Sequence, residues 1–348
     1  MKTGPIWEQA IREGRNSLLE HEVYALLDAA GIAIPRHLFI PRARWNDPEV
    51  IRELAQLSEK KIVLKISAPD ILHKTDVGGI ETAPCDESAL RQALARLAER
   101  FSTRPVRGIL ACEFVESDFR GWGSEILLGA RETEEWGPVL TLGAGGVDTE
   151  FFNRYYEGEH AFSIEAAALL DTPEALRSFA LHPALIRKLL GQARDKHAFL
   201  SESDVVSLVA RFRDLLLQSC EDHPESPVCI TQLEINPLLL REGRLIAVDG
   251  LCTFRPPRPV RASKPLRKLE NLFHPKSAAV IGVSEKMNIG RGILRKMAAS
   301  GFPRERLFVI KPGLDEIDGC RCVNSVRDLP DRVDLLVIAV SAQQAPDV

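Results

Sequence analysis

The chain of 348 residues is 45% hydrophobic and carries a formal net charge of −4, so it is long enough to bury the cores of two domains. This acidic balance provides no basic field for sequence-independent binding to nucleic acid. The first residues also lack the apolar run of a secretory signal or a membrane span. Seven cysteines without a C-x-x-C pair favour free thiols over disulfides or structural zinc. We therefore expect a globular, cytoplasmic protein.

Predicted helices and strands are mixed along the first two thirds of the chain. Apolar residues at helical spacing predict a helix over residues 17–31, with Ser17 as its N-cap and Gly31 as its stop. A β-branched run predicts a strand over residues 61–67 that leads into a loop. The other predicted elements are a helix at 88–101, strands at 106–115, 124–131 and 137–146, helices at 184–194 and 204–218, and strands at 228–235 and 244–250.

The composition changes between residues 255 and 270. This stretch is rich in proline and basic residues and lacks an apolar period, which predicts a solvated linker, although a basic cluster could also contact phosphate. Beyond it, predicted strands at 277–284, 306–311 and 334–340 alternate with a helix at about 289–300, a pattern typical of parallel βαβ units. Because a complete domain of this type needs more than ~100 residues, we interpret residues 271–348 as an incomplete one with a three-stranded parallel sheet.

Two segments after predicted strands have the character of phosphate-facing loops. The first, KISAPDILHKTDVGGI, begins with Lys65 at the end of an apolar run, where a lysine is uncommon. A strand lysine can direct a compact cation at a phosphate. The second, LGAGGVDTE, contains glycines that permit close backbone approach, although glycines after a strand also form plain turns.

Carboxylate and amide side chains mark two further candidate sites. Two hairpin strands in TQLEINPLLLREGRLIAVDG would set Glu234 or Asn236 beside Asp249, and hard oxygen ligands of that kind suit Mg²⁺. A capping Asn-Pro turn and a surface aspartate fit the same residues. Glu113 and Glu125 lie on neighbouring predicted strands, where a carboxylate could accept hydrogen bonds from a nucleotide or simply face solvent.

Together, these motifs resemble the ATP-grasp domain of the NDP-forming acyl-CoA synthetases, the ADP-forming acetate–CoA ligase group related to succinyl-CoA synthetase. The resemblance rests on YALLDAAGIAIPRH, DILHK-D-VGG and E-NPL…VD, in that order, over about residues 18–251, and the tail resembles the start of the CoA-binding domain of the same group. It implies an α/β fold. An ATP-grasp domain of two α+β subdomains would occupy residues 1–254, a linker 255–270, and a partial Rossmann-like CoA-binding domain 271–348.

The resemblance also implies roles for individual residues. His73 would be a transient phosphate acceptor, since imidazole is nucleophilic near neutral pH, and Lys74 or Lys65 would offset the developing charge. ATP would be bound by Lys65, Glu113, Phe114, Val115, Glu125, Gly145 and Gly146. CoA would be bound by Gly282, Ser284 and Gly290, and Mg²⁺ by Asn236 and Asp249. Lys311 and Gly313 depart from the usual Asn-Pro-Lys order of the family after the second strand of the tail.

The implied reaction is acid + ATP + CoA = acyl-CoA + ADP + phosphate, with ATP, Mg²⁺ and CoA as cofactors and a small carboxylic acid as substrate. The reaction of the family also needs a domain that carries the primary phosphohistidine. This sequence has no segment resembling that domain, so we expect the chain alone to be inactive and to need a partner chain or segment. The alternatives are a non-catalytic ATP- or CoA-binding regulatory module and a fragment of a longer synthetase.

Overall fold

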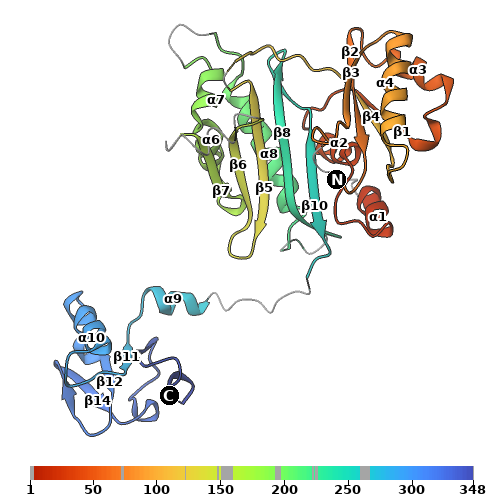
Figure 1. Cartoon of the computed structure of the whole chain (residues 1–348). Coiled ribbons are helices and arrows are strands. Elements are labelled where there is room, and N and C mark those ends of the chain that lie inside the picture. Colours follow the sequence, from red (N-terminus) through yellow and green to blue (C-terminus); the bar gives the residue numbers. More distant parts are fainter. Residues whose placement is uncertain are drawn as a thin grey trace. The chain divides into compact units, whose positions relative to one another are not determined.

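The computed structural model describes residues 4–71, 74–121, 123–146, 149, 160–192, 197–221, 223, 226–258 and 267–347. The chain forms two compact units, unit 1 (Met1–Arg258) and unit 2 (Pro259–Val348), which Figure 1 shows as a larger and a smaller body. Unit 1 contains two β-sheets and unit 2 contains one. Among the described residues, no helix has the length and apolar character that crossing a membrane requires.

The first sheet of unit 1 is antiparallel and has the strand order β1-β4-β2-β3. Its strands are β1 (His37–Pro41), β2 (Lys61–Ser67), β3 (Ile80–Pro84) and β4 (Gly108–Glu113). Helices α3 (Pro48–Ala55) and α4 (Glu87–Arg100) share an apolar core with one face of this sheet. Because side chains alternate along a strand, Leu64 and Ile66 enter that core, whereas Lys65 and Ser67 point to the opposite face.

The second sheet of unit 1 has the order β10-β8-β5-β6-β7, with β9 paired to β8. Its strands are β5 (Glu125–Thr133), β6 (Gly137–Ala144), β7 (Phe162–Ala166), β8 (Cys229–Arg241), β9 (Arg244–Ala247) and β10 (Gly250–Arg255). The helices that share its core are α1 (Gly4–Arg12), α2 (Glu20–Ala29), α6 (Pro173–Leu181), α7 (Ala184–Leu189) and α8 (Glu202–Leu217). Figure 1 shows α6, α7 and α8 beside this sheet.

Helix α2 contacts both sheets of unit 1. Its residues Val23, Leu26 and Leu27 belong to the core of the second sheet. Tyr24, on another side of the helix, is fully buried with Leu110 of β4 from the first sheet. A helix in this position can therefore place its first turn between side chains that come from the two sheets.

Unit 2 is built on a sheet with the order β13-β14-β12-β11-β15. Strands β11 (Ala278–Ile281), β12 (Leu307–Ile310), β14 (Cys320–Val323) and β15 (Leu335–Ile338) run parallel, and β13 (Glu316–Ile317) is antiparallel to β14. Helix α10 (Ile289–Ala299) follows β11, and helix α9 (Arg267–Phe273) precedes it. The mixed α/β class and the parallel βαβ arrangement of the tail are confirmed.

The predicted N-terminus of α2 is wrong. Ser17 forms a β-bridge with Thr253, so the helix starts later, at Glu20. Leu19 occupies the N-cap position, and its backbone N–H donates to the Glu22 carboxylate at 2.7 Å. The predicted stop is confirmed, because Gly31 directly follows the C-cap with a φ of 74°, a conformation that favours glycine.

Two further predictions, one for the tail and one for the linker before it, are also wrong. The parallel sheet has four parallel strands, not three, because β14 pairs with β12. This strand is short and contains the exposed Arg321, so it lacks a clear apolar run. In addition, α9 begins at Arg267, inside the stretch predicted as a linker, where the basic residues concealed the helical spacing of Leu269, Leu272 and Phe273.

Candidate functional site

A cavity of about 180 Å³ lies within unit 1, where α2, the end of β2 and the strands β8 and β10 meet. Its apolar wall includes Leu18, Ala68, Pro69 and Leu251. Its polar wall consists of Glu20, Ser67, Lys74, Glu234, Asn236 and Asp249. Segments of the chain that are far apart in the sequence therefore supply one set of charged and polar groups.

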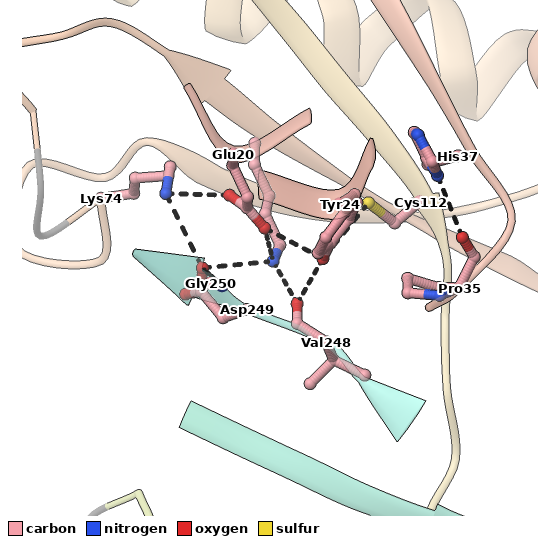
Figure 2. Close-up of polar contacts among 10 residues, drawn as sticks. Glu20, Tyr24, Pro35, His37, Lys74, Cys112, Val248, Asp249 and Gly250 are labelled. Carbon is pink, nitrogen blue, oxygen red and sulfur yellow. Dashed lines mark hydrogen bonds and ion pairs between the residues drawn. The ribbon is translucent and has the colours of Figure 1, made fainter. Parts of the chain in front are cut away.

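Sequence reasoning missed two residues of this wall, Ser67 and Glu20, of which Glu20 lies at the first turn of α2. Only 4% of Glu20 is exposed. Its Oε1 atom accepts a hydrogen bond from Lys65 Nζ at 2.6 Å, and its Oε2 atom lies 2.9 Å from Lys74 Nζ; Figure 2 shows the carboxylate beside the ammonium group of Lys74. The Tyr24 hydroxyl lies 3.0 Å from Oε1. No sequence signal separates Glu20 from Glu22, since both are first-turn acids that complement the helix dipole.

The two lysines around Glu20 are held differently. Lys65 Nζ also donates to the Val248 carbonyl oxygen at 2.6 Å, and the residue is buried behind the cavity wall. Lys74 has one short contact, with Glu20, and lines the cavity itself. Asp249 lies farther from both cations, with Oδ1 at 4.0 Å from Lys65 Nζ and at 3.9 Å from Lys74 Nζ. Lys74 is thus the more accessible cation, and the contact of Lys65 with a nucleotide stays a prediction.

The charges of this network shift the pKa values of its members. Burial by itself raises the pKa of Glu20, but the positive charges of Lys65 and Lys74 outweigh it and lower the pKa to about 2. Burial lowers the pKa of Lys65, and the charges of Glu20 and Asp249 reverse this and raise it. The pKa of Asp249 is raised, mainly by desolvation and then by repulsion from Glu20. Glu20 is therefore a fully compensated carboxylate, whereas Asp249 is compensated only in part.

The glycine loop after β6 packs tightly against the predicted ligands. Gly145 N–H donates to the Glu125 carbonyl oxygen at 2.8 Å, and Gly146 N–H donates to Asn236 Oδ1 at 2.7 Å. Gly146 has a φ of 60°, and a Cβ atom there would overlap Glu125 Oε2. The structure therefore brings together Glu125, Gly145, Gly146 and Asn236, and it explains the need for glycine by close approach of protein groups. Nucleotide binding by these residues stays a prediction.

The end of β4 and the stretch after it, which joins the first sheet to the second, contain the expected adenine-binding residues. Glu113 accepts a hydrogen bond from Arg36 N–H at 3.0 Å and forms an ion pair with Arg241 at 3.3 Å. Burial raises the pKa of Glu113, and these donors outweigh it and lower the pKa. Val115 is buried and Phe114 is 41% exposed. The Glu113 carboxylate is thus engaged by arginines, and an adenine contact of this stretch stays a prediction.

The prediction that the chain sets Glu234 or Asn236 beside Asp249 is confirmed. Asn236 N–H donates to the Asp249 carbonyl oxygen at 3.3 Å, and Glu234 lies opposite Leu251, two residues beyond Asp249. The described part of the chain holds no cluster of three or more His, Cys, Asp or Glu residues suited to a metal. Mg²⁺ needs only one or two carboxylates, since it keeps several waters. The incompletely compensated Asp249 carboxylate, in a cavity wall that also contains Asn236, therefore fits this ion.

The predicted phosphate acceptor, His73, lies outside the described residues. Its neighbour Lys74 is described and belongs to the polar wall. In unit 2, by contrast, all predicted CoA-binding residues are described: Gly282 and Ser284 lie in the turn between β11 and α10, and Gly290 is in the first turn of α10.

That turn is shaped by close backbone contacts. Gly282 has a φ of 88°, and a Cβ atom there would overlap the Ala339 carbonyl oxygen. A Cβ atom on Gly290 would lie 2.5 Å from the Gly282 carbonyl oxygen. Asn288, which sequence reasoning missed, is the N-cap of α10 and donates from Nδ2 to the same oxygen at 2.7 Å. Its position directly before the helix was the available signal.

Comparisons with known proteins agree with this architecture. A sequence profile of the ATP-grasp domain matches residues 9–253, and a profile of the CoA binding domain matches residues 276–348. An ADP-forming acetate–CoA ligase II of Archaeoglobus fulgidus is 28% identical over 332 residues, which cover 95% of this chain and 44% of the relative. This chain thus spans less than half the length of that relative.

In Pyrococcus furiosus, similar sequences occur in two separate subunits. Subunit beta of its ADP-forming acetate–CoA ligase I is 23% identical over 72% of this chain and 96% of the subunit. Subunit alpha is 43% identical over 84 residues, or 23% of this chain and 18% of the subunit.

Solved structures support the fold. A Candidatus Korarchaeum cryptofilum dinucleotide forming acetyl-coenzyme A synthetase 1, in complex with coenzyme A and Mg-AMPPCP, has a TM-score of 0.56 at 23% identity, covering 73% of this chain and 100% of that chain. The same coverage and identity hold for a complex with coenzyme A alone, at a TM-score of 0.59. The predicted order of an ATP-grasp domain followed by a CoA-binding domain is confirmed.

Proposed function

This chain belongs to the ATP-grasp family, and from that premise we propose that it supplies the nucleotide-handling part of an ADP-forming acid–CoA ligase. The proposed reaction is acid + ATP + CoA = acyl-CoA + ADP + phosphate. The observation that carries the proposal is the cavity of unit 1, because Lys74 and Asp249 both line it. Contacts with α2 hold together the segments that supply these two residues. Curated relatives that share most of this chain are ligases of this type.

The residues of the cavity wall would have different roles according to their charge. Asp249 and Asn236 would hold Mg²⁺, and this ion would neutralise part of the phosphate charge of ATP. Lys74 lines the cavity and can offer its ammonium group to a phosphate oxygen. The loop with Gly145 and Gly146 is attached to this wall by the hydrogen bond from Gly146 N–H to Asn236 Oδ1.

Unit 2 would bind CoA at the turn between β11 and α10. The N-terminus of α10 presents backbone N–H groups and the positive end of the helix dipole, which favour a pyrophosphate group. The missing side chains of Gly282 and Gly290 let the turn pack closely. One solved relative is described as an acetyl-coenzyme A synthetase in complex with coenzyme A and Mg-AMPPCP, which supports CoA as the ligand.

His73 would relay the phosphoryl group between the nucleotide and a phosphohistidine segment. A structure of the related Candidatus Korarchaeum cryptofilum enzyme is described as having a phosphohistidine segment that points towards the nucleotide binding site. The Pyrococcus furiosus relatives are separate alpha and beta subunits. We propose that a partner chain or segment supplies the phosphohistidine to this chain and that a small carboxylic acid is activated.

Calorimetric titration of the full chain with MgATP tests the nucleotide site. We expect Mg²⁺-dependent binding that Asp249→Asn weakens at least about tenfold, because the substitution removes the charge that holds the metal. Asp86→Asn is the matched control: it makes the same change at the N-cap of α4, where asparagine caps a helix as well as aspartate does. Absence of Mg²⁺-dependent heat at millimolar ATP would contradict the proposal.

A second experiment separates a ligase part from a regulatory module. The full chain is mixed with the alpha subunit of a related ligase, and acyl-CoA formation is measured. We expect turnover that His73→Ala abolishes while the affinity for ATP changes little, because the imidazole acts in the transfer and not in ground-state binding. ATP binding without turnover for any added subunit would favour the regulatory module.

A further inference from the structure

The cavity assigned to the phosphates of ATP contains an unexpected acid. Three carboxylates, of Glu20, Glu234 and Asp249, belong to its polar wall. Only two lysines, Lys65 and Lys74, lie close to them in the described part of the network. The described side chains around the cavity therefore sum to a negative charge, although the proposed ligand is a polyanion. A site built only to attract phosphate would have the opposite balance.

Glu20 competes with a ligand for the accessible lysine. Its Oε2 atom lies 2.9 Å from Lys74 Nζ, whereas the next acid, Asp249, is 3.9 Å away from that nitrogen. Figure 2 shows Lys74 directed at Glu20 and Asp249 together. A phosphate that recruits Lys74 must therefore share it with a buried carboxylate, and in a poorly solvated site the repulsion between the two anions is strong.

We propose that Glu20 is a specificity-determining residue that makes this site select metal-complexed polyphosphate over the free anion. The inference rests on the proposed nucleotide function. A free triphosphate must compete with Glu20 for Lys74, and it brings no cation to offset the charge of Asp249. A triphosphate that arrives with Mg²⁺ brings a cation for Asp249 and carries less net charge itself. The attraction of Lys74 and Lys65 then exceeds the repulsion of Glu20, so the metal complex binds and the free anion is rejected.

A neighbouring acid on the same helix, Glu22, provides a comparison, because its contacts serve only the helix. Glu22 is similarly buried, at 6% exposure. Its two carboxylate oxygens each accept a hydrogen bond from Arg15 at 2.7 Å, and one of them also accepts from Leu19 N–H. Glu22 is not among the residues that line the described cavity. Its contacts cap and anchor α2, whereas the contacts of Glu20 reach the two lysines at the ligand site.

The test compares the affinity for ATP with and without the metal. The dissociation constant of the full chain for ATP is measured by calorimetry in MgCl2 and in EDTA. The value in EDTA divided by the value in MgCl2 defines the metal selectivity. Glu20→Gln keeps the size of the side chain and removes its charge. We therefore expect the metal selectivity to fall by about tenfold or more, mainly because free ATP binds more tightly. Glu22→Gln is the matched control, and we expect it to leave the ratio unchanged even if it lowers the melting temperature.

A third variant distinguishes the effect of the lost charge from an effect of misfolding. Glu20→Asp keeps the charge within the network, so it is expected to retain the selectivity of the unmodified protein within about threefold. Three outcomes would each overturn the inference. They are a loss of metal selectivity in Glu20→Asp, an unchanged metal selectivity in Glu20→Gln, and a fall in metal selectivity in Glu22→Gln as large as that in Glu20→Gln. If the unmodified chain binds ATP in neither buffer, the proposed nucleotide function fails instead, and the two failures are thereby distinguished.

Discussion

The two candidate binding regions are built on different principles. In unit 1 the polar wall of the cavity collects charged side chains from α2, from the loop after β2, from β8 and from the residues between β9 and β10. In unit 2 the turn between β11 and α10 is one continuous segment, shaped by the absence of side chains at Gly282 and Gly290. The first region depends on balancing buried charges, and the second depends on leaving space for the backbone.

This difference determines what else each region supports. The contact of Glu20 with Lys65 joins α2 to a strand of the first sheet, so it also connects two parts of unit 1. The contact of Gly290 with Gly282 joins neighbouring segments of the same turn. We therefore expect charge substitutions in the first region to disturb stability as well as ligand binding, and added methyl groups to disturb the second.

Lys65→Met tests this expectation with the largest predicted effect. Removing Lys65 leaves the buried Glu20 carboxylate compensated only in part, by Lys74, so we expect the unfolding free energy of unit 1 to fall by about 3 kcal/mol. The side chains of Lys65 and Glu20 are only 8% and 2% exposed. Urea denaturation followed by tryptophan fluorescence measures unit 1 alone, because all four tryptophans of the chain lie within it.

Lys61→Met on the same strand is the control. Lys61 is exposed and contacts only the face of the Phe114 ring among its described charged and aromatic contacts, so we expect its loss to cost less than about 1 kcal/mol. Equal losses for the two variants would mean that the buried network contributes nothing beyond side-chain burial, and the contrast between the two regions would fail.

The pH dependence of stability isolates the contribution of Glu20. Its pKa is about 2 in the folded protein against an ordinary value of 4.5. The carboxylate therefore stabilises unit 1 above about pH 4.5, by about 3 kcal/mol, and this stabilisation is lost as the pH falls from there towards 2. Urea denaturation at pH steps between 6 and 2.5 should show a decline that is smaller in Glu20→Gln. An identical decline in both proteins would assign the acid sensitivity to other carboxylates.

Features that lie in one short segment could be predicted from the sequence. The bounds of β2 are those predicted, because its β-branched run ends at an Ala-Pro-Asp loop. Gly31 was recognised as the stop of α2 from local chemistry. The strand and the helix on either side of the turn of unit 2 were also predicted from local pattern, whereas the assignment of Gly282, Ser284 and Gly290 to that turn came from the resemblance to the family.

Features that depend on distant partners could not be predicted in the same way. Glu20 and Lys65 are 45 residues apart, and local sequence gives Glu20 no property that Glu22 lacks. Only the packing of α2 against both sheets turns one acid to the cavity and the other to Arg15. Likewise, β14 is a strand because β12 offers it an edge, and its own four residues carry little strand signal.

Gly290→Ala tests the second region, with a smaller expected effect. The added Cβ atom would lie 2.5 Å from a backbone oxygen that has little room to move, so we expect a loss of about 2 kcal/mol in the stability of unit 2. Gly292→Ala on the same helix meets nothing within 4 Å and should stabilise it by up to about 1 kcal/mol. Hydrogen exchange of residues 278–299 measures both. Equal protection in the two variants would show that close packing does not shape this turn.

Two buried serines of unit 1 provide the last and smallest comparison. Ser67, in the polar wall, is 2% exposed, and its hydroxyl has no hydrogen-bond partner in the part of the chain that the structure describes. Ser163 on β7 is 4% exposed, and its hydroxyl donates to the Phe179 carbonyl oxygen at 2.6 Å. Ser163→Ala should therefore cost about 1 kcal/mol, whereas Ser67→Ala should cost less than about 0.5 kcal/mol or stabilise the fold. Urea denaturation with tryptophan fluorescence compares them. A larger loss for Ser67→Ala would mean that its hydroxyl serves the fold, and the polar wall would then owe part of its composition to stability and not to a ligand.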